Sequence, residues 1–279
     1  MLVTSRTNPR VKQLRAAFSG NTRLAGGMIA IEGEHLLEEA MRSGLVFKTI
    51  FLSERRSLPE WIPGSVERIE LNEEVFASAV DTRSPQGIAA LLVPPVWRIE
   101  DVCRPNARGG TAPLMLLAAG LQDPGNLGTL IRSAEAFGAT AVLTTASTVS
   151  EWNQKALRAS AGSVFRMPVV QVTADDLAAL KSQGLRLLAA VADDPDKAGA
   201  VPVGKADLTG ACVLMVGNEG AGLGEEWLRL ADARVTIPTP GRVESLNAAI
   251  AGSLLLYEAS RQRAASQVKS RDRKLTTAL

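Results

Sequence analysis

"LMLLAAGLQDPGNLGTLIRSAEAFGATAVLTT" (residues 114–145) consists of two short apolar runs on either side of a segment with helical periodicity. The first run ends in a Pro-Gly turn, and the helical segment follows from about Asn126. Short apolar strands separated by helices are typical of a parallel sheet whose two faces are both covered. We therefore predict an α/β fold for this part of the chain.

The same alternation continues toward the carboxy terminus. The pattern predicts further strands over 167–172, 185–191, 211–217 and 233–238, and helices over 153–162, 174–184, 225–231 and 245–263. A parallel sheet of this kind binds ligands at the carboxyl ends of its strands. The loops after Gly120, Val216 and Ile237 are therefore the expected ligand-binding loops.

The first 95 residues have a different pattern of predicted helices and strands. They predict a helix over 33–44 and strands over 46–53, 66–71 and 87–93. A stretch rich in Pro, Gly and Arg then follows at 93–113, which is typical of a linker. We expect a smaller α/β domain at 1–95, a linker at 96–112, a second domain at 113–265 and a basic tail at 266–279.

Composition restricts the classes of protein. With 279 residues and 46% hydrophobic residues, the chain can bury a sizeable core. Cys103 and Cys212 lack the spacing of a disulfide framework or a zinc site, so we expect no metal. No export signal and no apolar run long enough for a membrane helix are apparent, which favours a cytoplasmic protein. The single histidine, His35, is read as structural or surface-exposed.

The net charge of +2 hides an uneven distribution. Five basic residues precede the first acidic residue, Glu32: Arg6, Arg10, Lys12, Arg15 and Arg23. Residues 261–279 are also basic. Basic arms on a near-neutral body favour a polyanionic partner such as RNA, with a solvated tail as the alternative interpretation of the last residues. We expect Arg6, Arg10, Lys12 and Arg23 to contact RNA.

Residues 121–139, "LQDPGNLGTLIRSAEAFGA", contain the first group of polar candidates. Asp123 and Asn126 are ordinary turn and cap residues. Arg132 lies on a helix whose other face is apolar, and a fixed guanidinium near the carboxyl end of a strand can bind a phosphate through two hydrogen bonds. A plain surface arginine is the alternative interpretation.

Residues 214–224, "LMVGNEGAGLG", place glycines around Asn218 and Glu219. Glycines let backbone N–H and C=O groups approach a ligand closely. The spacing does not fit a dinucleotide-binding fingerprint. "GAVPVGKA" at 199–206 resembles a phosphate loop, but Ala206 replaces the required Ser or Thr, so a nucleotide-dependent enzyme is not favoured.

Residues 237–252, "IPTPGRVESLNAAIAG", contain the third polar group. Ser245 stands where a helix is expected to begin and is read as its N-cap. Asn247, one turn inside that helix, is less easily explained because asparagine is a poor helix former. Without a histidine in the second domain, acid–base chemistry there must depend on Arg, Glu or backbone dipoles.

Together these three stretches resemble the signature motifs of the SpoU (TrmH) branch of the SPOUT methyltransferases, over residues 113–263. "TSRTNPRVKQLR" at 4–15 and "IEGEHLLEEA" at 31–40 are similar to the ribosomal-protein-like domain often fused ahead of that fold. The resemblance implies a parallel sheet with a deep carboxy-terminal trefoil knot. It also implies a homodimer formed through the knotted domain, and methylation of ribose 2′-hydroxyls of RNA with S-adenosylmethionine.

The resemblance also assigns site residues. It places five residues in the active site: Asn126, Arg132, Glu219, Ser245 and Asn247. It places cofactor contacts, largely through the backbone, on seven residues: Val216, Gly217, Asn218, Gly222, Ile237, Pro238 and Leu246. Arg132 is then either the base that takes the 2′-hydroxyl proton or the group that holds a phosphate which assists its removal.

Ribosomal RNA is the favoured substrate because of the appended amino-terminal domain. A transfer-RNA 2′-O-methyltransferase and a non-catalytic RNA-binding assembly factor are the alternatives. The five intact active-site residues favour an enzyme over an assembly factor, and cofactor binding discriminates between the two.

Overall fold

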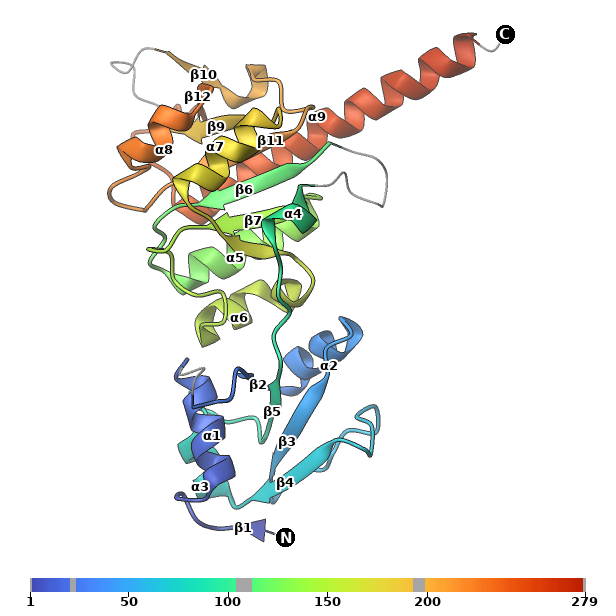
Figure 1. Cartoon of the computed structure of the whole chain (residues 1–279), viewed down its shortest axis with the longest axis vertical. Coiled ribbons are helices and arrows are strands. Elements are labelled where there is room, and N and C mark those ends of the chain that lie inside the picture. Colours follow the sequence, from blue (N-terminus) through green and yellow to red (C-terminus); the bar gives the residue numbers. More distant parts are fainter. Residues whose placement is uncertain (1, 21–23, 104–111, 193–198, 278–279) are drawn as a thin grey trace. The chain divides into compact units, whose positions relative to one another are not determined.

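The computed structural model describes residues 2–20, 24–103, 112–192 and 199–277, with side chains through residue 268. Its contacts divide the chain into two compact units (Figure 1). Unit 1 comprises Met1–Val96 and Ser150–Arg166, and unit 2 comprises Trp97–Val149 and Met167–Leu279. The packing thus differs in two respects from the predicted domains. Ser150–Arg166 pack with unit 1, and residues 97–103, which fall in the predicted linker 96–112, belong to unit 2, where Val102 is buried in the core.

Unit 1 is built on a five-stranded sheet with the order β1-β4-β3-β5-β2. Its strands are β1 (Leu2–Val3), β2 (Ile29–Glu32), β3 (Phe47–Ser53), β4 (Glu67–Leu71) and β5 (Ile88–Leu92). Its helices are α1 (Pro9–Phe18), α2 (Glu34–Arg42), α3 (Glu73–Ala79), α6 (Gln154–Ser160) and the short 3-10 helix η1 (Ser163–Phe165). The predicted helix at 33–44 is α2, and the three predicted strands are β3, β4 and β5.

The sheet of unit 1 buries apolar side chains beneath helices. α1 and α3 cover the core formed by Leu14, Phe51, Leu71 and Phe76, which are almost fully buried. α1 begins after Asn8, whose side chain accepts a hydrogen bond from the Arg10 N–H at 2.8 Å. The unit therefore has a core of its own.

Residues 150–166 are attached to unit 1 through one buried hydrogen bond and one partly exposed ion pair. The Gln154 amide donates to the carbonyl of Ala30 on β2 at 2.9 Å, and Arg166 forms an ion pair with Glu39 on α2 at 2.8 Å. Gly162 has φ +88°, and a Cβ there would lie 2.6 Å from Cβ of Glu39. Only glycine fits this close approach to α2.

Unit 2 is built on a seven-stranded sheet with the order β10-β12-β9-β11-β6-β7-β8, in which every described pair is parallel. Its strands are β6 (Leu114–Ala118), β7 (Ala141–Thr144), β8 (Val169–Gln171), β9 (Arg186–Ala190), β10 (Ala200–Pro202), β11 (Cys212–Val216) and β12 (Ala233–Thr236). Its helices are α4 (Ile99–Val102), α5 (Pro124–Ala136), α7 (Ala174–Ser182), η2 (Val203–Lys205), α8 (Glu225–Leu230) and α9 (Ala248–Thr277). The predicted parallel sheet is confirmed.

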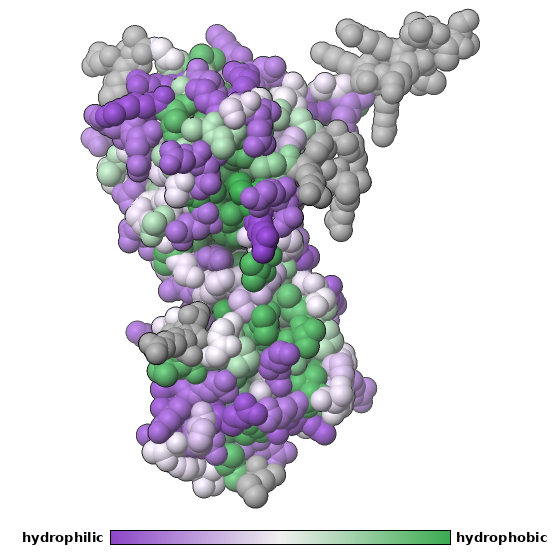
Figure 2. Space-filling model, viewed as in Figure 1, coloured by the Kyte–Doolittle hydropathy of each residue, from purple (hydrophilic) through white to green (hydrophobic). Residues whose placement is uncertain are grey.

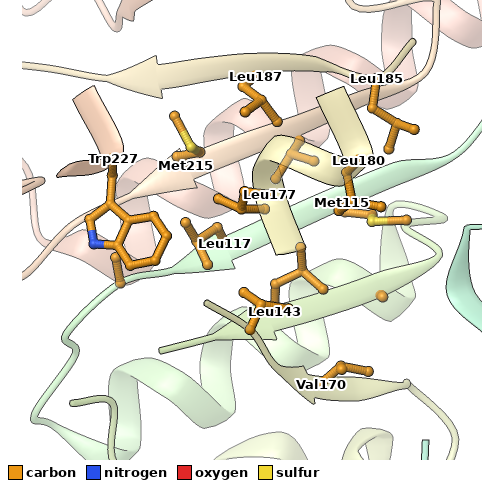
Figure 3. Packing of buried hydrophobic residues seen from close by; sticks show 14 of the residues in the cluster. Met115, Leu117, Leu143, Val170, Leu177, Leu180, Leu185, Leu187, Met215 and Trp227 are labelled. Atoms are coloured by element: carbon orange, nitrogen blue, oxygen red, sulfur yellow. The ribbon is translucent and has the colours of Figure 1, made fainter. Parts of the chain in front are cut away.

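Helices cover both faces of this sheet. On one face, alternate residues of the central strands pack under α7 and α8, with Met115, Leu177 and Trp227 among the labelled side chains (Figure 3). On the other face, α5 and α9 pack against each other and α9 contacts β11. Gly252 permits the close contact of α9 with α5, because a Cβ at this position would lie 2.4 Å from Cδ2 of Leu130 on α5. The central strands β6 and β11 are thus buried from both sides, which explains their continuous apolar sequences.

Two predicted boundaries in unit 2 were wrong. α9 begins at Ala248, three residues after Ser245, and its backbone stays helical to Thr277, so the predicted tail at 266–279 lies largely within a helix. The segment 199–206 forms β10 and η2, although no strand was expected there. A three-residue strand that ends in proline has too little pattern to be recognised.

Hydrophilic residues cover much of the visible face of each unit, with smaller hydrophobic areas between them (Figure 2). Within the described ranges, no helix has both the length and the apolar character needed to cross a membrane.

Candidate functional site

A cavity of about 480 Å³ lies at the carboxyl edge of the parallel sheet in unit 2. Its walls come from the loops after β9, β11 and β12 and from the first turn of α9. The three strands are neighbours in the sheet, so loops that are far apart in sequence meet at one edge. The volume falls within the roughly 300–1,000 Å³ that is usual for small-molecule sites.

The loop after β11 is held in a tight turn. Asn218 and Gly222 exchange backbone hydrogen bonds, with Asn218 N to Gly222 O at 3.0 Å and Gly222 N to Asn218 O at 2.9 Å. A Cβ on Gly217 would lie 2.1 Å from the carbonyl carbon of Gly222 and 2.2 Å from the Leu223 nitrogen. Glycine at 217 is therefore a condition for closing the loop that forms one wall of the cavity.

The Asn218 side chain joins this loop to the one after β6. Its Oδ1 accepts from the N–H groups of Gly220 at 2.9 Å and Ala221 at 3.2 Å. Its Nδ2 donates to the carbonyl of Gly120 at 2.9 Å. One side chain thus shapes its own loop and fixes it against a second one.

Three of the predicted active-site residues form a hydrogen-bonded chain. Asn126 Nδ2 donates to Oε1 of Glu219 at 2.6 Å, and Asn247 Nδ2 donates to Oδ1 of Asn126 at 3.2 Å. Asn126 is placed by the start of α5, where Asp123 accepts a hydrogen bond from its backbone N–H at 2.9 Å. The structure therefore brings residues from all three sequence motifs together.

Asn247, and not Ser245, caps α9. Its Oδ1 accepts from the backbone N–H groups of Ala249 at 2.9 Å and Ile250 at 3.2 Å. These bonds satisfy two of the free N–H groups at a helix start, which explains why asparagine stands there. The predicted N-cap role of Ser245 was wrong, and Ser245 lies instead in the exposed loop that lines the cavity.

Arg132 lies outside this chain of hydrogen bonds. It follows Asn126 by six residues, which corresponds to about 9 Å along the axis of α5. The side chain is exposed, and within the described part of the chain it makes no hydrogen bond or ion pair. Its guanidinium is therefore available to an anion outside unit 2.

Six of the seven predicted cofactor residues line the cavity: Val216, Gly217, Asn218, Gly222, Ile237 and Leu246. Pro238 does not line it. Sequence reasoning missed the wall formed by residues 190–192 at the end of β9 and the contribution of Arg234, and it assigned no role to Glu244, which also lines the cavity. The position of 190–192 at the end of a parallel strand was the signal that could have found that wall.

The predicted RNA-binding residues lie in unit 1. Arg10 is paired with Glu67 at 2.6 Å, and Arg6 lies 3.6 Å from Glu74. Lys12 is exposed on α1. Arg23 lies outside the described residues. Contact with RNA at these positions stays a prediction, and for Arg6 and Arg10 it requires competition with these exposed ion pairs.

The fold and the cavity define a class: an α/β domain that binds a small ligand at the carboxyl edge of a parallel sheet, with backbone groups and a few carboxamide and carboxylate side chains around it. The model of the SpoU rRNA Methylase family matches residues 113–257, and that of the MRM3-like substrate binding domain matches residues 8–90. The chain belongs to the SpoU rRNA Methylase family, as its three motifs predicted.

Similar proteins span nearly the whole chain. A Bacillus subtilis 23S rRNA (guanosine(2553)-2'-O)-methyltransferase, RlmP, is 33% identical over 91% of this chain and 97% of its own length. The structure of an AdoMet-bound rRNA methyltransferase from Sinorhizobium meliloti matches with a TM-score of 0.79 and 30% identity, covering 94% of this chain and 97% of that one. The structure of the SpoU methyltransferase AviRb from Streptomyces viridochromogenes in complex with AdoMet matches with a TM-score of 0.78 and 29% identity. It covers 92% of this chain and 98% of that one.

Proposed function

We propose that this protein is an S-adenosylmethionine-dependent methyltransferase that modifies a ribose 2′-hydroxyl in ribosomal RNA. The observation that carries the proposal is the cavity at the carboxyl edge of unit 2, which adjoins the chain formed by Asn126, Glu219 and Asn247. Whole-length relatives named as rRNA 2′-O-methyltransferases support both the reaction and the substrate class.

S-adenosylmethionine fits the cavity in size and in chemistry. The loop after β11 offers backbone polar groups beside Gly217, where the absence of a Cβ permits close approach. The apolar lining from Val216, Ile237 and Leu246 suits an adenosine moiety. When bound there, the cofactor would supply an electrophilic methyl group.

The protein must then orient the 2′-oxygen in line with the methyl group and assist loss of the hydroxyl proton. Asn126 and Asn247 hold Glu219 and the motif loops in a fixed arrangement, and Ser245 positions ribose or cofactor at the cavity wall. Arg132 binds the neighbouring phosphate. Two routes are open for the 2′-hydroxyl proton: direct transfer to Arg132, or removal assisted by that phosphate. The second route is included because arginine stays protonated in proteins.

The role of Arg132 is tested by methyl transfer from tritiated S-adenosylmethionine to unmodified ribosomal RNA. Arg132→Ala abolishes transfer but keeps cofactor binding. Arg229→Ala is the matched control, because Arg229 is an exposed arginine of the same unit, paired with Glu225 at 2.6 Å and not part of the cavity wall. Retained transfer by the Arg132 variant contradicts the assigned role.

We also propose a homodimer formed through α9 and α5. Ile250, Leu254 and Tyr257 are 53%, 41% and 53% exposed and, with i, i+4, i+7 spacing, share one face of α9. Arg132 on the adjacent α5 would then lie close to the subunit boundary. Sedimentation should show a dimer that Leu254→Lys converts to a monomer and that Leu24→Lys, a change at a 69% exposed leucine of unit 1, leaves intact. A monomeric unmodified protein contradicts the proposal.

The trefoil knot and the cytoplasmic location also remain proposals. The family supports the knot, and the return of α9 onto β11 and α5 is compatible with it. The bacterial relatives named as 23S rRNA 2′-O-methyltransferases support the location.

A further inference from the structure

Arg234 is a charged residue in the cavity wall that none of the three motifs includes. It lies on β12 and lines the cavity together with Ala190 and Thr239. Its register partners on the two neighbouring strands are Ala189 on β9 and Ala200 on β10. Methyl side chains on both sides leave space for a long side chain next to the cavity.

The guanidinium of Arg234 is not engaged within unit 2. Among the described residues it has no hydrogen bond or ion pair, and the residue is exposed. The nearest acidic residue along the strand, Asp232, is already bound to Lys181 at 2.8 Å and to the Leu187 N–H at 2.8 Å. Burial acts to raise the pKa of Asp232, but these hydrogen bonds outweigh burial and hold that pKa below its ordinary value.

The charges of the cavity wall complement those of the proposed cofactor. Arg234 is the one cationic side chain of the wall among the described residues, and Glu219 and Glu244 are its two carboxylates. S-adenosylmethionine carries one carboxylate and two cationic groups, the sulfonium and the ammonium. Arg234 lies on β12 and Glu219 follows β11, and β9 separates these two strands in the sheet. Glu219 is tied to Asn126 in the active-site chain, so the sulfonium belongs beside Glu219 and the amino-acid end belongs toward Arg234.

The geometry points to Arg234 as the residue that binds the α-carboxylate of the cofactor and so selects ligands that carry an amino-acid end. A guanidinium can pair with a carboxylate through two parallel hydrogen bonds, which adds direction as well as affinity. Arg234 is thus a positioning residue: it fixes the amino-acid end of the cofactor, and the adenosine end is held by the loops. The inference rests on S-adenosylmethionine being the ligand of the cavity.

Calorimetric titration with two probes tests this assignment. S-adenosylhomocysteine keeps the amino-acid end, whereas 5′-methylthioadenosine lacks it. Arg234→Ala should weaken binding of S-adenosylhomocysteine about tenfold, the effect of one charge-assisted contact, and leave binding of methylthioadenosine unchanged. Arg234→Lys should restore part of the loss, because it keeps the charge without the paired geometry. Arg229→Ala should behave as the unmodified protein toward both probes.

The outcomes separate the assignment from the proposed function. Equal weakening of both probes would show that Arg234 supports the loop or the adenosine end, and an unchanged affinity for both would show that it does not touch the cofactor; either overturns the assignment. Weakened RNA binding with unchanged S-adenosylhomocysteine affinity also overturns it, in favour of a phosphate contact. Failure of the unmodified protein to bind S-adenosylhomocysteine would instead contradict the proposed cofactor.

Discussion

Gly217→Ala should abolish the closed form of the loop after β11 and weaken cofactor binding strongly. The added Cβ would lie 2.1 Å from the carbonyl carbon of Gly222 and 2.2 Å from its oxygen and from the Leu223 nitrogen. All three are backbone atoms, so no side chain can rotate away and the loop must open. Opening removes the two backbone hydrogen bonds between Asn218 and Gly222.

Two such hydrogen bonds contribute about 1–3 kcal/mol together. If the ligand must restore them on binding, the dissociation constant for S-adenosylhomocysteine rises roughly 5- to 150-fold. Isothermal titration measures this change, and circular dichroism shows whether the variant folds. Gly220→Ala is the matched control in the same loop, because its Cβ would meet only Oδ1 of Asn218, at 3.7 Å. Unchanged affinity for the Gly217 variant, or equal loss for both variants, refutes the reasoning.

Three further predictions concern stability and the helix caps. Gln154→Ala should lower the free energy of unfolding by about 1–3 kcal/mol in urea denaturation, because it leaves the buried carbonyl of Ala30 without its donor; no loss would contradict the role of residues 150–166 in unit 1. Asn247→Ala should lose about 1 kcal/mol because it removes the cap of α9, and Asn247→Asp should lose less, because its carboxylate keeps the cap although it can no longer donate to Asn126; equal losses would argue against the cap. Hydrogen bonds from the backbone and side chain of Thr173 hold the pKa of Asp176 below its ordinary value. The stabilisation by Asp176 is thus present at neutral pH and lost as the pH falls through that lowered pKa, so Asp176→Asn should flatten the acid limb of a stability–pH curve, and an unchanged limb would contradict this.

Much of unit 2 could be predicted from the sequence because its strands are buried on both faces. Strands such as β6 and β11 are unbroken apolar runs bounded by glycine or proline, so their type is evident without tertiary information. The order of the strands is not evident in this way. β11 lies between β6 and β9 only because the chain returns to the middle of the sheet, and that choice is made by packing.

The errors at the site have a common physical cause. Ser245 and Asn247 are both good N-cap residues, and local sequence cannot say which one the helix uses. Tertiary structure decides which residue is the N-cap. Ser245 and Leu246 form part of the cavity wall, so the helix begins only after them. The packing of 150–166 with unit 1 is hidden for the same reason: the buried amide of Gln154 finds its acceptor 124 residues away.

The contact between Asn126 and Glu219 spans 93 residues and has no local signal. The family resemblance grouped the two residues, and the structure shows a direct hydrogen bond between them. Arg234 had neither a local signal nor a motif, because a single arginine on a short strand resembles any surface residue. Its relation to the cavity becomes visible only when the loops after β9 and β12 are in place.

The position of the transferred methyl group decides whether the protein is a ribose 2′-O-methyltransferase. The purified protein is incubated with tritiated S-adenosylmethionine and unmodified ribosomal RNA, the RNA is digested to nucleosides, and the labelled nucleosides are separated. We expect label in a 2′-O-methylnucleoside. Label on a base would contradict the proposed acceptor, and no label with ribosomal or transfer RNA would contradict the enzymatic role itself.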